Sequence, residues 1–290
     1  MIDTASPNGA ALLRVEELTV EFRGGGLFSL GRSMVHAVRN VSFSVGRGEA
    51  YGLVGESGSG KTTTGRCVLG LQSPTKGSIR LADDDVGELR RRDPEVLHRR
   101  IQAVFQNPIA SLNPAMTVEM ILAEPLRRLA DVRDRDDARR RSIELLDEVR
   151  LPREILNRRP TELSGGQAQR VSIARALASH PMLIVLDEAV SALDVATQAQ
   201  VINLLAELRD ETGVSYLFIA HDLAVVRHLS DRIGVMSNGE IVEEGPASDI
   251  CRTPSHEYTQ RLLAAVPVPD PTVKRVRRDP NRDESVETQD

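Results

Sequence analysis

One stretch of the sequence has the residue types and spacing that bind a phosphate chain. Residues 55–62, GESGSGKT, fit the pattern GxxxxGK(S/T) and lie between a run typical of a buried strand and a helical run. Glycines in this pattern let backbone N–H groups turn toward a β-phosphate, while Lys61 reaches the β- and γ-oxygens and Thr62 offers its hydroxyl to Mg²⁺. An ordinary Gly- and Ser-rich turn is the alternative, and it leaves Lys61 and Thr62 unexplained. The predicted phosphate-binding residues are Gly55, Glu56, Ser57, Gly58, Ser59, Gly60, Lys61, Thr62 and Thr63.

Two acidic residues follow a second run typical of a buried strand. The apolar residues 183–186 end in Asp187 and Glu188, so both carboxylates are predicted to leave the strand at its C-terminal end. Ligands bind at that end in open α/β sheets. Asp187 is predicted to hold Mg²⁺ through water, and Glu188 to polarise the attacking water. Such a pair is often only a helix-capping loop, and the phosphate loop favours the catalytic interpretation.

Two further polar residues follow apolar runs. His221 ends the run YLFIA, and its ring can donate a hydrogen bond to a γ-phosphate. Gln106 follows the run IQAVF and begins a helical region. Its amide can contact Mg²⁺ or the metal-bound water, which predicts a sensor of the nucleotide state. Each residue alone would be interpreted as structural or as surface, so both predictions depend on the phosphate loop and the acidic pair.

A second glycine-rich turn, LSGGQ, begins another helix at residues 163–167. Ser164 is a good N-cap, and Gln167 three residues later completes a capping box. The cap does not explain Gly165 and Gly166, because other residues form the first turn of a helix better. Two glycines bring backbone N–H groups close to an anion, with the helix dipole behind them. A γ-phosphate is the natural candidate.

The pattern of the surrounding elements predicts an α/β protein. Strand-like runs occur at residues 14–22, 41–45, 50–55, 182–187 and 214–221, and residues 73–81 form a turn followed by a strand. The region from Asn107 to His180 has a helical pattern, and a further helix lies between the last two strands. This alternation favours a mainly parallel sheet. Asn238 and Gly239 predict a tight hairpin near the end of the fold.

Composition and charge exclude several classes of protein. The chain has 290 residues, 40% of them hydrophobic and 27% charged, and a formal net charge of -5, which argues against a nucleic-acid partner. No run approaches the ~20 apolar residues of a membrane span, and the N-terminus lacks the pattern of a secretion signal. Cys67 and Cys251 are too few for a disulfide framework or a four-thiolate metal site, so both are predicted to be packing residues in a reducing compartment.

In this order, the phosphate loop, Gln106, LSGGQ, LDE, SALD and His221 resemble the ATPase subunit of an ABC transporter over about residues 10–250. The resemblance implies an ABC-type P-loop NTPase domain with ATP and Mg²⁺ as cofactors. It also implies a RecA-like core with an antiparallel β subdomain and an inserted α-helical subdomain. The implied boundaries are 10–255 for the whole domain, 10–106 and 181–255 for the core, and 107–180 for the helical subdomain.

The resemblance further implies a dimer in which the LSGGQ signature of one subunit meets the ATP on the phosphate loop of the other. The partner is a second copy or a related subunit. The interface residues would be Ser164, Gly165, Gly166, Gln167 and Asp194. An aromatic residue stacks on adenine in this family, and Phe22 is preferred here over Phe28. A role for Phe22 in the core of a strand is an equal alternative.

Two stretches resemble the ATPases of oligopeptide and dipeptide importers, a group that also includes nickel and glutathione importers. They are FQNPIASLNPAMTV at 105–118 and HEYTQRLLAAVPVPDP at 256–271. The second also fits an amphipathic helix through Tyr258, Leu262 and Val266, and both interpretations can hold. Some relatives carry a C-terminal cysteine cluster for iron and sulfur, which this chain lacks. Residues 272–290 are predicted to be a disordered tail.

Three positions depart from the family pattern. Ala189 and Val190 stand where many relatives have Pro and Thr, and Ala168 replaces a common Arg in the signature. None of these changes removes a reacting group, so they bear on the rate of hydrolysis rather than on hydrolysis itself.

The sequence thus predicts a peripheral ATP-hydrolysing subunit on the cytoplasmic face of the membrane, coupled to a separate permease that docks on the helical region after Gln106. Peptides are the predicted solute, and nickel, glutathione or another small solute is the alternative. An extracytoplasmic solute-binding protein is implied by the resemblance alone. An ABC-type ATPase of DNA repair or translation, and a subunit that binds ATP without hydrolysing it, are the competing interpretations.

Overall fold

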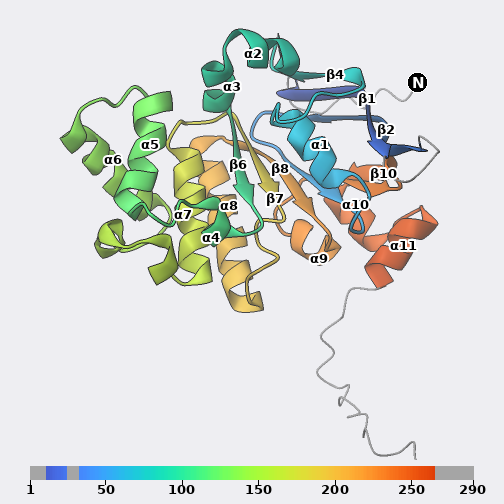
Figure 1. Ribbon diagram of the computed structural model, residues 1–290. Helices are drawn as coiled ribbons and strands as arrows, with labels where there is room; N and C mark the ends of the chain where they lie inside the picture. The colour runs from blue at the N-terminus through green and yellow to red at the C-terminus, as the bar shows by residue number, and fades with distance from the viewer. Residues whose placement is uncertain (1–10, 25–32, 265–290) are drawn as a thin grey trace, which may run out of the picture.

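The structure is a computed structural model that describes residues 11–24 and 33–264. It contains two sheets and a group of helices that lies to one side of them (Figure 1). The predicted tail at 272–290, Phe28 and Val266 lie outside the described residues. Within the described part of the chain, no helix is both long enough and apolar enough to span a bilayer.

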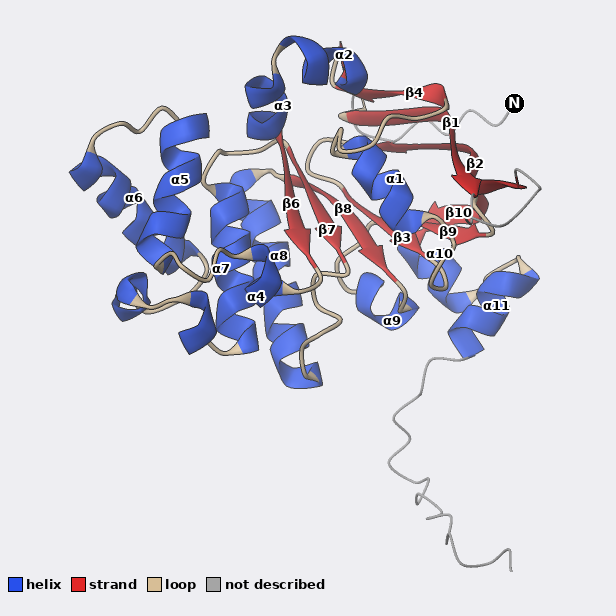
Figure 2. Ribbon diagram, viewed as in Figure 1, coloured by secondary structure: helices blue, strands red, loops and turns tan. Residues whose placement is uncertain are grey.

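The central sheet has six strands in the order β10-β9-β3-β8-β7-β6 (Figure 2). They are β3 (Ala50–Val54), β6 (Ile101–Phe105), β7 (Leu183–Asp187), β8 (Ser215–Ala220), β9 (Arg232–Ser237) and β10 (Glu240–Pro246). All neighbours are parallel except β10, which runs antiparallel to β9. This confirms the predicted, mainly parallel sheet.

The two faces of the central sheet contribute to different cores, because successive side chains of a strand point to opposite faces. Tyr51 and Leu53 of β3 face a core shared with the second sheet and helix α1 (Lys61–Val68). Ala50 and Val54 of the same strand face the core under the large helices. Every residue of β3 and β8 is buried, as expected for strands covered on both sides.

The second sheet is antiparallel and has the order β2-β1-β4-β5. Its strands are β1 (Leu13–Gly24), β2 (Ser33–Val45), β4 (Lys76–Leu81) and β5 (Asp84–Asp85). Figure 1 shows this sheet at the top right, beside α1. The implied antiparallel β subdomain is thereby confirmed.

Most of the helices lie between β6 and β7 or after β7. Between β6 and β7 lie α4 (Pro108–Ser111), α5 (Val118–Leu129), α6 (Arg135–Glu148) and α7 (Gly165–Leu177). After β7 come α8 (Val195–Thr212), α9 (Leu223–Val226), α10 (Ala247–Arg252) and α11 (Glu257–Ala264), whereas α2 (Val86–Arg92) and α3 (Pro94–Arg100) precede β6. Thr117, Asp134 and Asp194 each accept a backbone N–H and so begin α5, α6 and α8. The subdomain boundaries at 107 and 180 stay a prediction.

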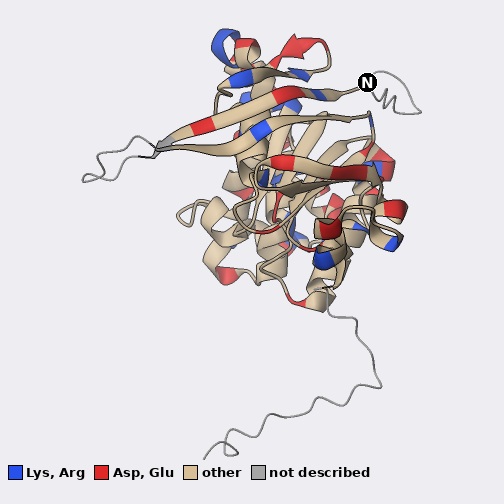
Figure 3. Cartoon of the chain, turned by 90° about the vertical axis from the view of Figure 1, so that its right-hand side faces the viewer, with Lys and Arg blue, Asp and Glu red and all other residues tan. Residues whose placement is uncertain are grey.

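Two smaller sequence predictions concern the turns and the surface. Asn238 and Gly239 join β9 to β10 with φ values of 50° and 87°, so the predicted hairpin is confirmed. Acidic and basic residues are interspersed on the face shown in Figure 3. Cys67 and Cys251 are both buried, and burial raises the pKa of the Cys67 thiol to about 11.

Candidate functional site

The phosphate loop connects β3 to α1 and encloses the amine of Lys61. This side chain is buried, at 4% exposure, and its Nζ donates to the carbonyl oxygens of Gly55 at 2.7 Å and Glu56 at 2.8 Å. A third bond, at 3.2 Å, goes to Oγ of Ser59. Burial lowers the pKa of Lys61, and the carboxylates of Glu188, Asp187 and Glu56 raise it again in part. The loop therefore holds one positive charge at its centre.

Two glycines of the loop adopt backbone conformations that other residues rarely adopt. Gly58 has a φ of 82° and Gly60 a φ of 106°. A Cβ on Gly58 would meet nothing within 4 Å, so its requirement is conformational. A Cβ on Gly60 would also lie 2.4 Å from the carbonyl oxygen of Ala37. Gly60, a glycine of the sequence pattern, and Gly58, which lies between the two pattern glycines, are therefore required by the backbone of the loop.

Thr62 and Asp187, two of the three residues predicted to hold Mg²⁺, lie together. Oγ1 of Thr62 donates to Oδ1 of Asp187 at 3.3 Å. Burial raises the pKa of Asp187, the bond from Thr62 lowers it, and the neighbouring Glu188 raises it. A hydroxyl and a partly desolvated carboxylate are hard oxygen ligands of the kind Mg²⁺ takes. These residues fit the predicted metal.

Glu188 and His221 face each other at the C-terminal ends of β7 and β8. Nδ1 of His221 lies 3.8 Å from Oε2 of Glu188. Glu188 has a φ of 49°, and its N–H donates to the carbonyl oxygen of Ile219 at 2.9 Å. This left-handed backbone is held by its neighbours, a pattern common at functional sites.

A small cavity lies beside this pair. Its volume is about 220 Å³, and its polar lining includes Glu188, Ser191, Gln198 and His221. Ser191 also donates from Oγ to the carbonyl oxygen of Glu188 at 2.9 Å. Sequence reasoning missed Ser191 and Gln198 as lining residues. Ser191 was part of the quoted SALD motif, whereas Gln198 gave no signal.

Gln106 lies at the same edge of the sheet. It follows Phe105, which pairs with Asp187 in the register of β6 and β7, and its side chain is exposed. The structure thus places Gln106 beside the acidic pair. Its predicted role as a sensor stays a prediction.

The second glycine turn forms the capping box that the sequence predicts. Oγ of Ser164 accepts from the N–H of Gln167 at 3.3 Å, and Oε1 of Gln167 accepts from the N–H of Ser164 at 3.0 Å. Gly165 and Gly166 belong to the first turn of α7. The cap therefore uses the side chain of Ser164 and leaves the glycines to be explained separately.

The need for glycine at position 166 has an explanation within the chain that the sequence did not reveal. A Cβ there would lie 2.6 Å from Cγ2 of Thr197, whereas a Cβ on Gly165 would be at an ordinary 3.6 Å from Leu193. Thr197 is fixed by Asp194, which accepts its N–H at 3.0 Å and its hydroxyl at 2.7 Å. These bonds, the one from the Thr197 hydroxyl first, lower the pKa of Asp194. The signature turn and the start of α8 are thus packed together.

The two glycine turns do not meet within the chain. The end of α1, at Cys67 and Val68, contributes to the core between the two sheets, and α7 contributes to the core on the other face of the central sheet. In Figure 1 the two helices lie on opposite sides of strands β6 to β8. The structure therefore brings together Lys61, Thr62, Asp187, Glu188 and His221, with Gln106 at the same edge, and leaves Ser164, Gly165 and Gly166 apart from them.

Phe22 lies in β1 and its side chain is 44% exposed, so the alternative of a core-strand residue is wrong. An exposed ring can stack on a base, and this role stays a prediction. Ala168, Ala189 and Val190, the departures from the family pattern, are all buried in the core on the helical side of the sheet.

Known proteins resemble this chain over most of its length. The sequence model described as ABC transporter matches residues 38–191, and the one described as oligopeptide/dipeptide transporter, C-terminal region, matches residues 242–290. The chain is 48% identical over 260 residues to the oligopeptide transport ATP-binding protein OppF of Bacillus subtilis, a match that covers 89% of this chain and 85% of that protein. It is 46% identical over 271 residues to the glutathione import ATP-binding protein GsiA of Pectobacterium atrosepticum, covering 93% of this chain and 43% of that protein.

A solved structure has the same fold. The dimeric ATP-binding cassette MJ0796, in a post-hydrolysis state bound to ADP and Pi, has a TM-score of 0.71 and 30% identity to this chain. The match covers 81% of this chain and 98% of that one. The predicted fold class is confirmed, and the chain belongs to the ABC transporter family as an ATP-binding subunit of the P-loop ATPase fold.

Proposed function

We propose that this chain is the ATP-hydrolysing subunit of an importer that takes up oligopeptides or dipeptides, and that it acts in a dimer with a second ATPase subunit. The observation that supports this most directly is that the two glycine turns begin helices, α1 and α7, that pack on opposite faces of one sheet. Each turn presents a helix start suited to a phosphate, and neither completes the other within one chain.

In this proposal the phosphate loop binds the β- and γ-phosphates of ATP. Lys61 exchanges its bonds to the carbonyl oxygens of Gly55 and Glu56 for bonds to phosphate oxygens, which are better acceptors for an ammonium group. Thr62 and Asp187, already in contact, would hold Mg²⁺ directly and through water, with Gln106 as a further ligand. The metal would neutralise charge on the β- and γ-phosphate oxygens.

Hydrolysis would depend on the pair beside the small cavity. Glu188 orients the attacking water and accepts its proton, and His221 donates a hydrogen bond to the γ-phosphate. Their side chains lie 3.8 Å apart and line the same cavity, so a water and a phosphate oxygen in that cavity could each contact one of them.

The second glycine turn would act on the partner's nucleotide. Backbone N–H groups at Gly165 and Gly166, with the hydroxyl of Ser164 and the amide of Gln167, would contact its γ-phosphate. Asp194 would lie in the same interface. The next residue, Val195, is apolar and 84% exposed, so it could pack against the partner. Loss of the γ-phosphate would release the two subunits from each other. The dimeric state of the MJ0796 cassette supports this arrangement.

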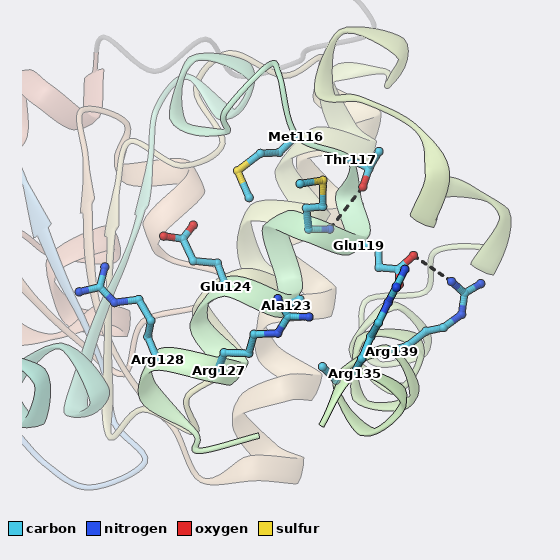
Figure 4. A pocket seen from close by; sticks show the side chains of 11 residues that line it. Met116, Thr117, Glu119, Ala123, Glu124, Arg127, Arg128, Arg135 and Arg139 are labelled. Atoms are coloured by element: carbon cyan, nitrogen blue, oxygen red, sulfur yellow. Dashed lines mark hydrogen bonds and ion pairs between the residues drawn. The ribbon is translucent and has the colours of Figure 1, made fainter. Parts of the chain in front are cut away.

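The permease would dock on the helical side of the molecule. A cavity of about 710 Å³ lies between α5 and α6, lined by Met116, Glu119, Met120 and several arginines (Figure 4). Met120 is 54% exposed, and Glu119 is held by Arg139 at 2.9 Å. An apolar floor with a charged rim suits an amphipathic helix from a cytoplasmic loop. Because the cavity follows Gln106 in the chain, docking there can affect the segment that contacts the metal.

The comparisons support peptides as the solute. OppF is named for oligopeptide transport, and the C-terminal region model is named for oligopeptides and dipeptides. GsiA is named for glutathione import, which supports glutathione, itself a tripeptide, as the second candidate. The subunit would lie on the cytoplasmic face of the membrane, with a permease and an extracytoplasmic solute-binding protein as its partners.

The decisive experiment for catalysis is Glu188→Gln in the transporter reconstituted with its permease. We expect turnover to fall by about 10²- to 10⁴-fold, because the general base is lost, while ATP binding stays and the dimer accumulates. Steady-state phosphate release, nucleotide binding and size-exclusion chromatography measure the three effects. Unchanged turnover would contradict the catalytic assignment.

The docking surface is tested by Met120→Glu, which places a charge on the apolar floor of the cavity. We expect about tenfold weaker association with the permease and unchanged ATP affinity. Leu71→Glu is the matched control, since Leu71 is equally apolar and 57% exposed but lies elsewhere, after α1. Equal losses in both variants would show that the cavity is not the docking site.

A further inference from the structure

The last described helix, α11, makes a direct contact with the phosphate loop. The backbone N–H of Glu56 donates to the hydroxyl oxygen of Tyr258 at 3.0 Å. Glu56 is the second residue of the loop, and Tyr258 lies in the first turn of α11. The C-terminal region named for oligopeptide and dipeptide transporters therefore reaches the nucleotide site.

Tyr258 is fixed well enough to hold the loop in place. Its side chain is only 8% exposed and belongs to the core on the helical side of the central sheet. One turn later on the same helix, Leu262 packs against that core. A buried ring with a single polar tip places its hydroxyl with little freedom. The apolar face of this helix, which the sequence predicted, therefore fixes the Tyr258 hydroxyl beside the loop.

The start of α11 is anchored to the sheet that carries the loop. Oε1 of Glu243 in β10 accepts from the N–H of Ser255 at 2.7 Å and from its hydroxyl at 2.8 Å. Oε2 of the same carboxylate accepts from the N–H of His256 at 3.2 Å. Nδ1 of His256 in turn accepts from the N–H of Tyr258 at 3.1 Å. Both the ring and the backbone of Tyr258 are therefore tied to the core.

The contact extends through one peptide to the functional lysine. Nζ of Lys61 donates to the carbonyl oxygen of Gly55, and the N–H of the same peptide group, that of Glu56, donates to Tyr258 on its other side. The Glu56 N–H is consequently not among the donors that face a phosphate. The N–H of Gly239, in the turn between β9 and β10, also donates to the loop, to the carbonyl oxygen of Ser59 at 3.0 Å. The loop is therefore held from outside at two points, and one of them comes from the C-terminal region.

We propose that Tyr258 is a positioning residue of the nucleotide site, through which the C-terminal region holds the phosphate loop in the form that binds ATP. This inference rests on the proposed role of the loop in ATP binding. Without the hydroxyl, the Glu56 N–H loses its acceptor and the first turn of the loop becomes free to rotate. Affinity for ATP and ADP falls together, because both carry the β-phosphate. The reaction at Glu188 is unaffected once the site is full.

The test is Tyr258→Phe in the full chain, which removes one oxygen atom and keeps the ring. We expect the Kd for Mg-ATP and for Mg-ADP to rise about fivefold, with kcat at saturating ATP unchanged. Tyr216→Phe is the matched control, because the hydroxyl of that buried tyrosine donates to the carbonyl oxygen of Leu205, away from the loop, at 3.0 Å. Hydrogen exchange at the Glu56 amide should accelerate in Tyr258→Phe alone.

The outcomes separate this inference from the proposed function. If Tyr258→Phe binds both nucleotides like the wild type, or weakens them only as much as Tyr216→Phe does, the inference is wrong. Unchanged exchange at the Glu56 amide also overturns it, whatever the affinity. If Lys61→Ala keeps full affinity, the proposed function fails, and amide exchange still decides whether Tyr258 holds the loop.

Discussion

The phosphate loop and the signature turn both contain glycines, but for different structural reasons. In the phosphate loop, Gly58 and Gly60 have left-handed φ values that side chains with a Cβ rarely adopt. In the signature turn, Gly165 and Gly166 are ordinary helical residues, and only the absence of a Cβ distinguishes them. The first turn needs glycine for its backbone conformation, whereas at Gly166 in the second turn Thr197 leaves no room for a Cβ. A glycine motif in a sequence therefore does not by itself reveal which property was required.

The turns also differ in how complete they are. The phosphate loop is filled by its own lysine and supported by the β9–β10 hairpin and α11. At the signature turn, the side chains of Ser164 and Gln167 each accept a backbone N–H of the other residue, and Asp194 accepts from Thr197. In the proposed function, the first turn is a complete phosphate-binding site and the second is a surface for the partner's nucleotide. Substitutions in each should separate binding from turnover.

The largest effect is expected at the phosphate loop. Lys61→Ala should weaken ATP binding by the isolated chain about 100-fold, because a charge-assisted contact to the phosphates is lost. Lys76→Ala, at an exposed lysine of β4, is the control and should bind normally. Equilibrium binding of a fluorescent nucleotide measures both. Equal affinities for the two variants would mean that the loop does not bind phosphate.

Ser164→Arg, in the signature turn, is expected to lower turnover while ATP binding is kept. Turnover should fall about 30-fold through loss of contacts to the partner's γ-phosphate, while ATP affinity of the single chain stays within about twofold. Phosphate release and nucleotide binding, measured on the same preparation, give the two numbers. Normal turnover in a transporter whose ATPase subunits all carry the change would remove the shared-site model. Recovery of turnover on mixing with Lys61→Ala chains would show that the partner is a second copy.

Gly166→Ala tests whether packing against Thr197 is the reason for glycine at position 166 of the signature turn. The added methyl would meet Thr197 at 2.6 Å, so we expect a loss of about 1–2 kcal/mol in the free energy of unfolding. Thr197→Ser in the same chain removes the opposing methyl, keeps the hydroxyl bonded to Asp194 and should restore most of the loss. Gly165→Ala, with ordinary contacts, is the control. Denaturant unfolding that ranks Gly165→Ala as the more damaging change would contradict this explanation.

The smallest effect concerns the carboxylate beside Thr62. Burial raises the pKa of Asp187 in the folded chain, so its ionisation opposes folding as the pH rises from the ordinary carboxyl pKa through the raised one. Asp187→Asn should therefore unfold about 2 °C higher than the wild type at pH 7 without nucleotide, and the difference should shrink toward pH 4. Thermal unfolding across this range checks the sign. A variant that is less stable at pH 7 would refute it.

Local patterns predicted much of the fold and of the phosphate-facing residues. Alternation and apolar runs indicated the principal strands, and Asn238–Gly239 indicated their hairpin, because these signals depend on neighbours in the chain. The acidic pair and His221 were predicted to share one edge because parallel strands end together. The fit of Gly166 against Thr197 and the bond from Glu56 to Tyr258 were not predicted. Both depend on distant segments meeting at atomic distances, which spacing does not encode.

The position of β3 in the central sheet has a consequence for the order of events during synthesis. This strand carries the phosphate loop, yet its two neighbours, β8 and β9, end only at Ala220 and Ser237. The acceptor for Glu56 follows 202 residues after it. A ribosome must therefore release nearly the whole chain before the loop gains its flanking strands, and contacts of such long sequence separation form slowly. Nascent chains that stop short of β9 should emerge unable to retain nucleotide.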